Sequence, residues 1–355
     1  MSRRLANLAS RFVGTGGVHV VDPTPDWRPI LDDLARLEQN IAARGLPRRE
    51  LEQLRSRYLE WYDAFERTKK GEKEGKAEAR SRVDALLDVM DLPNTLGQVG
   101  DEMETEQRMP AGEAALKSLG LLRKFKGTLS MSGRPVIALR KIRQDLQSSF
   151  SNAHLSSPPF FARPALLEAM NWNLEDYLSF SDGSTKTFLL GHTLPTLLSS
   201  FIRARFSEGQ EWPIQMHSAG PSYHNSPIQL VDGRQREKHC IVALCRCSDE
   251  ASEWSHSTRN ILHSYYKDTL DLNSVSSRLL SAPELTIAES SAHVVTSSGV
   301  SLSRVSMYDD FLSRRLNLAH STGKLVHVAF AETDLSRLLS LLFDPATPKR
   351  VTDVL

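Results

Sequence analysis

Apolar residues recur at alternating three- and four-residue steps in two neighbouring segments near the start of the chain. The first series is Leu51, Leu54, Tyr58, Trp61 and Phe65. The second series is Ala79, Val83, Leu86 and Met90. This spacing is typical of helices that pack against one another, and a charged turn separates the two series. We therefore predict an antiparallel helical hairpin, preceded by a helix over 30–43 and ended by Pro93.

Beyond residue 110, short apolar runs bounded by polar residues indicate strands. The run 325–330 is rich in β-branched residues, as expected of a buried strand. A helix is predicted directly after it, with Thr333 or Asp334 as its N-cap. Further strands are predicted over 187–190, 215–219, 240–247 and 292–296. Further helices are predicted over 111–125 and 141–150.

Composition limits the classes of protein to consider. With 355 residues, of which 40% are hydrophobic and 25% charged, the chain is long enough for a substantial core and two domains. The formal net charge is +1, so a basic surface must be local if it exists. No apolar run approaches the ~20 residues of a membrane-spanning helix, and no membrane partner is expected.

The three cysteines, Cys240, Cys245 and Cys247, lie within eight residues of one another. Their number is odd and they lack the C-x-x-C spacing, which argues against a disulfide framework. A zinc site would need a fourth ligand, for which His239 is the nearby candidate. We favour thiols in a buried strand over a metal site, and no metal is expected.

The first 21 residues contain no acidic side chain and interleave Arg3, Arg4 and Arg11 with apolar residues, serines and alanines. This basic, amphipathic composition is typical of a mitochondrial transit peptide, whereas the alternative is a basic disordered tail. We predict a transit peptide over 1–21 and localisation in the mitochondrial matrix.

The turn of the predicted hairpin carries a group of cations. They are Arg67, Lys69, Lys70, Lys73 and Lys76. Glutamates are interspersed among them, so a solvated tip is the simpler interpretation and an RNA contact the more specific one.

Several segments resemble seryl-tRNA synthetases, and they occur in the order expected of that family. They are Asn40–Gly45 (N-x-x-x-R-G), Leu92-Pro93-Asn94, Pro158–Arg163 (PPFFAR), Asp310–Leu318 (DFLSRRLNL) and the helix that carries Arg337. Together the segments span roughly 30–342, nearly the whole chain. The resemblance implies an α+β fold, with a short coiled-coil arm over 27–105. A class II synthetase-like domain over 110–355 follows, built on an antiparallel sheet flanked by helices.

The PPFFAR segment implies a pairing surface, since the corresponding segment of these synthetases lies near their dimer interface. The residues concerned are Pro158, Pro159, Phe160, Phe161 and Arg163. The resemblance therefore implies either a homodimer or a heterodimer with mitochondrial seryl-tRNA synthetase.

The residues that bind substrates in the family have changed here. Leu194 stands where the resemblance places a glutamate for the substrate amine, and His224 where it places the arginine for the α-phosphate. A leucine cannot pair an ammonium group, and a neutral histidine lacks the guanidinium fork that matches phosphate. His239 and Arg337 remain at related positions. The resemblance thus implies an inactive protein without a cofactor.

We therefore expect a catalytically inactive paralogue, similar to degenerate mitochondrial relatives of these synthetases in insects, that binds tRNA or other mitochondrial RNA or pairs with the genuine synthetase. Such a protein would support mitochondrial translation and genome maintenance. One alternative is a divergent active synthetase or ligase, which would need Arg234, Arg236 or Lys238 as phosphate ligands. Another is a stand-alone RNA-binding factor that uses the hairpin tip and the cations at 140, 141 and 143.

Overall fold

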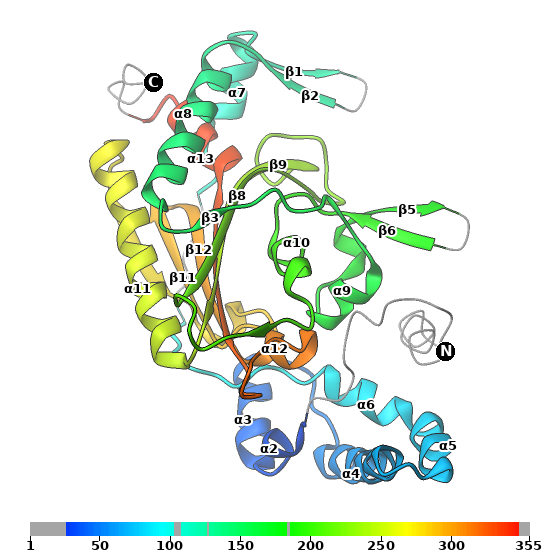
Figure 1. The fold of residues 1–355 in the computed structure, drawn as a ribbon. Coiled ribbons are helices and arrows are strands. Elements are labelled where there is room, and N and C mark those ends of the chain that lie inside the picture. The colour runs from blue at the N-terminus through cyan, green and yellow to red at the C-terminus, as the bar shows by residue number, and fades with distance from the viewer. Residues whose placement is uncertain (1–25, 103–107, 126–127, 183–184, 348–355) are drawn as a thin grey trace.

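A computed structural model describes residues 26–102, 108–125, 128–182 and 185–347. The chain first forms a group of helices and then a large sheet with helices on both faces (Figure 1). The predicted transit peptide over 1–21 lies outside the described residues. Within the part that is described, no helix is long and apolar enough to cross a membrane.

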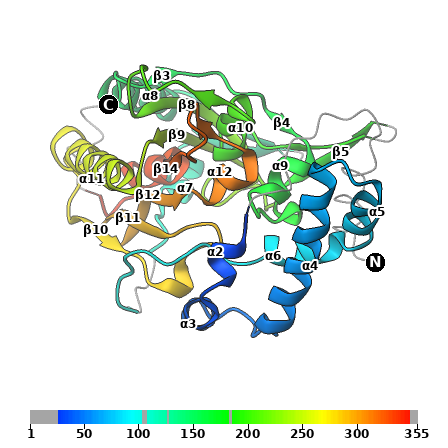
Figure 2. The same ribbon diagram turned by 60° about the horizontal axis from the view of Figure 1, so that its bottom comes forward.

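The predicted helical hairpin is present, and its second half is interrupted. Its helices are α2 (Arg28–Leu31), α3 (Leu34–Ala43), α4 (Leu51–Lys69), α5 (Lys73–Ser81) and α6 (Val83–Met90). Helices α5 and α6 fold back along α4, as Figure 2 shows from below. The helix expected over 30–43 is divided because the Asp33 carboxylate accepts a hydrogen bond from the Arg36 amide and caps α3. Trp27, Tyr58 and Trp61 fill the core of this unit.

Seven strands form the main sheet. They are β3 (His154–Leu155), β8 (Ile214–Tyr223), β9 (Gln235–Cys245), β10 (Val275–Leu279), β11 (Ser291–Ser297), β12 (Val300–Asp309) and β14 (His327–Asp334). The order across the sheet is β10-β11-β12-β14-β9-β8-β3. Every pair is antiparallel except β3, which runs parallel to β8 at the edge. The α+β fold class with an antiparallel sheet is confirmed.

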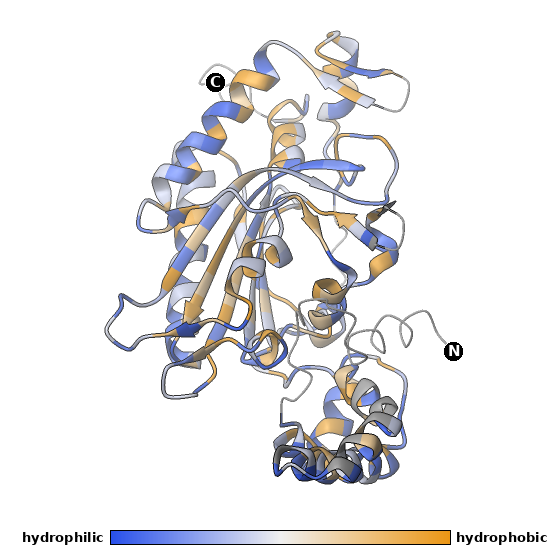
Figure 3. Cartoon of the chain, turned by 45° about the vertical axis from the view of Figure 1, so that its right-hand side comes forward, coloured by the Kyte–Doolittle hydropathy of each residue, from blue (hydrophilic) through white to orange (hydrophobic). Residues whose placement is uncertain are grey.

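Helices cover both faces of this sheet (Figure 1). One face packs against α8 (Arg134–Ser149), α11 (Ser248–Ser264) and α13 (Leu335–Leu342). The other packs against α9 (Pro164–Ala169), α10 (Leu194–Leu198) and α12 (Phe311–Leu316). Figure 3 shows the apolar strands between these layers. Successive residues of β9 therefore enter two different cores, and the strand is buried on both sides.

The N-cap prediction for α13 is confirmed at Asp334, whose carboxylate accepts a hydrogen bond from the Arg337 amide at 2.8 Å. The helix predicted over 111–125 is wrong in its second half. Helix α7 (Gly112–Ser118) ends before Gly120, whose φ of +71° cannot continue a helix. The chain then forms a hairpin of β1 (Leu122–Phe125) and β2 (Thr128–Met131).

Two smaller sheets flank the main one. The first has the order β4 (Phe161–Ala162), β6 (Thr185–Leu189) and β5 (Leu178–Asp182). The second pairs β7 (Arg205–Phe206) with β13 (Ala319–His320).

Buried polar side chains join the helical unit to the sheet. Arg44 donates hydrogen bonds to the carbonyls of Thr286 and Glu289. Arg315 is fully buried, donates to the Met90 carbonyl and lies 4.6 Å from the centre of the Trp27 ring. Arg44 of the N-x-x-x-R-G segment and Arg315 of the Arg-Arg pair therefore have a structural role, because their contacts hold the arm against the sheet.

Candidate functional site: a charged cavity on the sheet

A cavity of about 410 Å³ lies on the sheet face that α9, α10 and α12 cover. Its floor is formed by one face of the strands β9, β12 and β14. Nearer α12 this face carries apolar side chains, and in the cavity charged side chains replace them along the same strands. The residues that line it include Trp172, Tyr177, Thr193, His224, Arg236, Lys238, Glu289, Arg304, Ser306, Tyr308, Phe330 and Glu332.

Lys238 and Glu332 form the first ion pair of the floor, from the neighbouring strands β9 and β14. The Lys238 ammonium lies 3.0 Å from the Glu332 carboxylate. Burial opposes ionisation of both groups, yet their mutual attraction outweighs it and raises the pKa of Lys238 while lowering that of Glu332. The lysine is therefore charged and its charge is already compensated within the chain.

Arg304 and Glu289 form the second ion pair, at 2.5 Å. The Glu289 carboxylate is almost fully buried, and it also accepts a hydrogen bond from the Ser306 hydroxyl at 2.5 Å. Burial alone would raise the pKa of Glu289, but Arg304 and these hydrogen bonds hold it below the usual range. Both arginine and carboxylate are thus ionised and paired at neutral pH.

His224 lies at the edge of the cavity, just after β8. Burial, with smaller contributions from Lys238 and Arg236, lowers the pKa of His224 to about 3. Its ring centre is 5.3 Å from that of Tyr177, and its Nε2 has no hydrogen-bond partner among the described residues. The histidine is therefore neutral at pH 7 and supplies no positive charge to the cavity.

Thr193, and not Leu194, faces the cavity. Leu194 is fully buried in the apolar cluster beneath α10. Thr193 lines the cavity and caps α10 through a reciprocal arrangement with Thr196. The segment 193–194 therefore presents a neutral hydroxyl, and no carboxylate, to the cavity.

The structure does not bring His239 and Arg337 into the cavity. His239 is on the opposite face of β9 from Lys238, where its Nε2 lies 3.2 Å from Nδ1 of His217. Burial, aided by His217, lowers the pKa of His239 to about 3. Arg337 pairs with Asp232 at 2.5 Å and donates to the Ser301 carbonyl. Neither of the two lines the cavity.

Glu289, Arg304 and Glu332 were not predicted from the sequence. Arg304 lies on β12, a strand in which serines alternate with apolar residues and which the search for apolar runs missed. Alternation of apolar and polar residues over 300–303, which resumes in the other phase from Val305 to Met307, is the signal that would have indicated this strand. Glu289 lies in the turn before β11, and only tertiary contact places it beside Arg304.

The predicted pairing surface is partly exposed. Phe161 is 55% exposed and its ring meets that of Phe180 edge to face at 6.1 Å. Phe180 is 50% exposed, and Pro159 and Arg163 are also exposed, whereas Pro158 is buried. Phe160 is more constrained because its ring lies 5.3 Å from that of His192.

Of the cations at the hairpin tip, Arg67 forms an ion pair with Glu78 across the hairpin. Lys70 is exposed at the end of α4. The side chains of Lys69, Lys73 and Lys76 lie outside what the structure describes.

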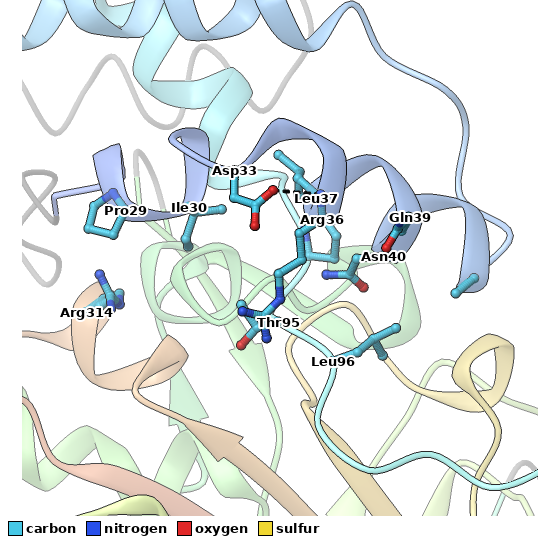
Figure 4. Close-up of a pocket in the computed structure, with 12 residues that line it drawn as sticks. Pro29, Ile30, Asp33, Arg36, Leu37, Gln39, Asn40, Thr95, Leu96 and Arg314 are labelled. Atoms are coloured by element: carbon cyan, nitrogen blue, oxygen red, sulfur yellow. Dashed lines mark hydrogen bonds between the residues drawn. The ribbon is translucent and has the colours of Figure 1, made fainter.

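Figure 4 shows a second cavity, of about 430 Å³, between α3, the segment 93–96 and α12. Arg36 extends from α3 across this space towards Thr95, and Arg314 approaches from α12. None of the predicted site residues lines it. Arg314 is already bound to Asp310 at 2.5 Å.

The three cysteines are free thiols. Cys240 and Cys245 are buried in β9 as predicted, whereas Cys247 is exposed beyond the end of the strand. Across 26–102, 108–125, 128–182 and 185–347, no three histidine, cysteine or acidic side chains are grouped as metal ligands.

Neither a protein-family model nor a curated protein sequence matches the chain. Solved structures do. The cytoplasmic serine-tRNA ligase of Naegleria fowleri, in complex with AMP, has a TM-score of 0.69 at 15% identity, and the match covers 90% of this chain and 94% of that one. The seryl-tRNA synthetase of Pyrococcus horikoshii, complexed with ATP, has the same TM-score and coverage at 13% identity. The chain has the fold of a seryl-tRNA synthetase.

A prolyl-tRNA synthetase of Giardia lamblia, in complex with prolyl-adenylate, matches less of the chain. Its TM-score is 0.59 at 10% identity, and the match covers 65% of this chain and 51% of that one. The matches to the seryl-tRNA synthetases leave about a tenth of this chain uncovered, so they take in residues of the N-terminal helices. The fold therefore corresponds to a class II synthetase with a helical arm at its N-terminus.

Proposed function

We propose that this chain is a seryl-tRNA-synthetase-like protein that does not activate serine and acts by binding other macromolecules. One observation carries the proposal: the three cations that line the cavity all lie close to carboxylates of the same chain, and for Arg236 that carboxylate is Asp232, which is 3.4 Å away and is shared with Arg337. Lys238 pairs with Glu332, and Arg304 pairs with Glu289.

Amino-acid activation by ATP depends on cations that stabilise charge developing on the phosphates. A cation that is already paired must break that pair to meet a phosphate, and it leaves a buried carboxylate without a partner. His224 adds no charge, because its pKa is about 3, and Thr193 offers a substrate amine no negative charge. Together, these features support the proposal that the chain does not activate serine.

The proposed partner is the mitochondrial seryl-tRNA synthetase, with a second copy of this chain as the other arrangement. Support comes from exposed apolar side chains at the edge of the molecule that carries the PPFFAR segment. Phe161 and Phe180 are each at least half exposed, and Leu155 on the edge strand β3 is 65% exposed. Exposed aromatic side chains of this kind are typical of interface centres.

The proposed location is the mitochondrial matrix, where the protein would support translation and genome maintenance. The support is the acid-free, arginine-containing composition of residues 1–21. Fusing residues 1–25 to a fluorescent protein tests this location, because a cytosolic reporter would exclude the proposed targeting.

The catalytic proposal is tested by serine-dependent ATP–pyrophosphate exchange with the purified chain. We expect no exchange above that of a sample without protein. Exchange at a rate comparable to that of a genuine seryl-tRNA synthetase, run alongside, would show that the ion pairs open and that the chain is a divergent enzyme.

The pairing proposal is tested by co-purification of the chain with mitochondrial seryl-tRNA synthetase. The double variant Phe161→Asp/Phe180→Asp places charge on the proposed interface, so it should abolish the complex and remain folded. Leu119→Asp is the matched control, because Leu119 is 65% exposed and lies at the end of α7, away from the PPFFAR segment in the sequence. A double variant that still co-purifies would exclude this surface.

A further inference from the structure

One segment of the chain has a charge very different from the rest. Residues 114–144 contain eight lysines and arginines and no aspartate or glutamate, although the whole chain has 44 basic and 43 acidic residues. The segment forms most of α7, the β1–β2 hairpin and most of α8. Charge separation of this kind is the electrostatic signature of a surface for an anionic partner.

Most of these cations point into solvent. Arg123, Lys124, Arg134 and Arg140 are exposed, and none of the four forms an ion pair within the described part of the chain. Lys141 is also exposed. Towards the ends of the segment, Lys117 pairs with Glu113 and Arg143 with Glu237. We call Arg123, Arg134, Arg140 and Lys141, together with Phe125, the basic surface.

The fold makes this surface continuous. Gly133, with a φ of +71°, turns the chain from β2 directly into α8, and the Ser132 amide bonds the Leu121 carbonyl at the base of the hairpin. Along α8, residues 134, 137 and 141 are spaced by three and four, so they share the exposed side of the helix. Figure 1 shows hairpin and helix at one end of the molecule, with α4 to α6 at the other.

An aromatic side chain accompanies the cations on the hairpin. Phe125 and Arg123 are two residues apart on β1, so they lie on the same face of the hairpin. Their partners on β2 are the small residues Thr128 and Ser130. Phe125 is 67% exposed beside them. A protruding hairpin thus presents an arginine and a phenylalanine side by side.

From this arrangement we infer that the basic surface binds a single-stranded nucleic acid, with the cations along its phosphates and Phe125 stacked on a base. This inference does not depend on the proposed pairing, because Phe161 and Phe180 are not part of the surface. The exposed aromatic ring favours a nucleic acid over an acidic protein, since bases stack on aromatic side chains and carboxylates do not.

The experiment measures binding of the full chain to a fluorescein-labelled, 20-nucleotide single-stranded RNA by fluorescence anisotropy at several salt concentrations. The variant Arg123→Ala/Arg134→Ala/Arg140→Ala removes three phosphate contacts. We expect its affinity to fall about 100-fold at 0.1 M salt, and the slope of log affinity against log salt to decrease by about 2. Phe125→Ala should weaken binding about tenfold with the slope unchanged.

The matched control is Arg48→Ala/Lys267→Ala/Lys324→Ala, which removes the same charge from exposed positions elsewhere. Circular dichroism checks that both triple variants are folded. Equal losses in the two variants, or no RNA binding by the wild type, would overturn the inference. So would binding to polyglutamate as tight as to RNA, because that result would assign the surface to an acidic protein. The same measurement with a single-stranded DNA of equal length and concentration shows whether the surface distinguishes ribose from deoxyribose.

Discussion

The cavity and the basic surface carry the same kind of residue in opposite states. In the cavity, Lys238 and Arg304 each contact a carboxylate of the same chain. On the basic surface, Arg123, Arg134 and Arg140 are exposed and form no ion pair within the described residues. The two regions lie in one domain, so composition cannot account for the difference.

Solvent exposure explains it. A buried charge loses its hydration and must regain the free energy from a partner in the protein, whereas an exposed charge keeps its water. The cations of the cavity are therefore held in ion pairs within the folded chain. The exposed ones contribute little to stability and are available to an anionic partner. In this fold the charged residues of the cavity floor are thus paired with one another, while the cations that can bind an anionic partner lie on the basic surface.

The largest effect should follow from breaking a buried pair. Glu289→Gln leaves Arg304 without its carboxylate and weakens the bond from Ser306. We expect a loss of about 3–5 kcal/mol in the free energy of unfolding, because an uncompensated charge remains buried. Urea denaturation at pH 7 measures it. Glu208→Gln, at an exposed position, is the control. A loss below about 1 kcal/mol would contradict our account of the pair.

An intermediate effect is expected from the buried histidines. The folded-state pKa values of His224 and His239 are about 3, below the usual value of 6.5, so the unfolded state binds more protons as the pH falls below 6.5. Stability should therefore decrease with falling pH, by about 1.4 kcal/mol per pH unit for each histidine between pH 6 and 4.5. Urea midpoints across this range measure it, and His239→Gln should reduce the slope by about 1.4 kcal/mol per pH unit, the contribution of one histidine. An unchanged slope would contradict the assignment.

The smallest effect on stability should come from the basic surface. Arg140→Gln changes an exposed side chain without an ion pair among the described residues, so the free energy of unfolding should change by no more than about 0.5 kcal/mol. Its affinity for single-stranded RNA should nevertheless fall about fivefold at 0.1 M salt, which corresponds to one phosphate contact. A large loss of stability in this variant would remove the contrast with the cavity.

Local sequence patterns predicted the main elements well where apolar residues dominated the segment or recurred at heptad spacing. The heptad spacing from Leu51 to Phe65 identified α4, and the apolar run at 325–330 identified β14 with its cap at Asp334. They failed where a glycine ended a helix early or where polar residues interrupted the apolar residues of a strand. Gly120 ends α7 before the predicted boundary, and the serines of β12 hide a strand that is buried on both faces.

The candidate site was predicted less completely. The segment around residue 193 and His224, both singled out from the sequence, border the cavity. Two other side chains singled out from the sequence point away from the cavity. A shift of one residue along the chain moves a side chain to the other face of a strand or into the core. Leu194 is in the apolar cluster, and His239 faces away from Lys238.

By itself, the sequence determined the heptad-spaced helices of the arm, the apolar strands of the sheet, the order of the family-like segments and the concentration of positive charge between residues 114 and 144. These properties depend on neighbours along the chain. Only the tertiary structure decided which charges are available. The pairs Lys238–Glu332 and Arg304–Glu289 join residues that are 94 and 15 positions apart, and they form because packing strands against helices removes those groups from water.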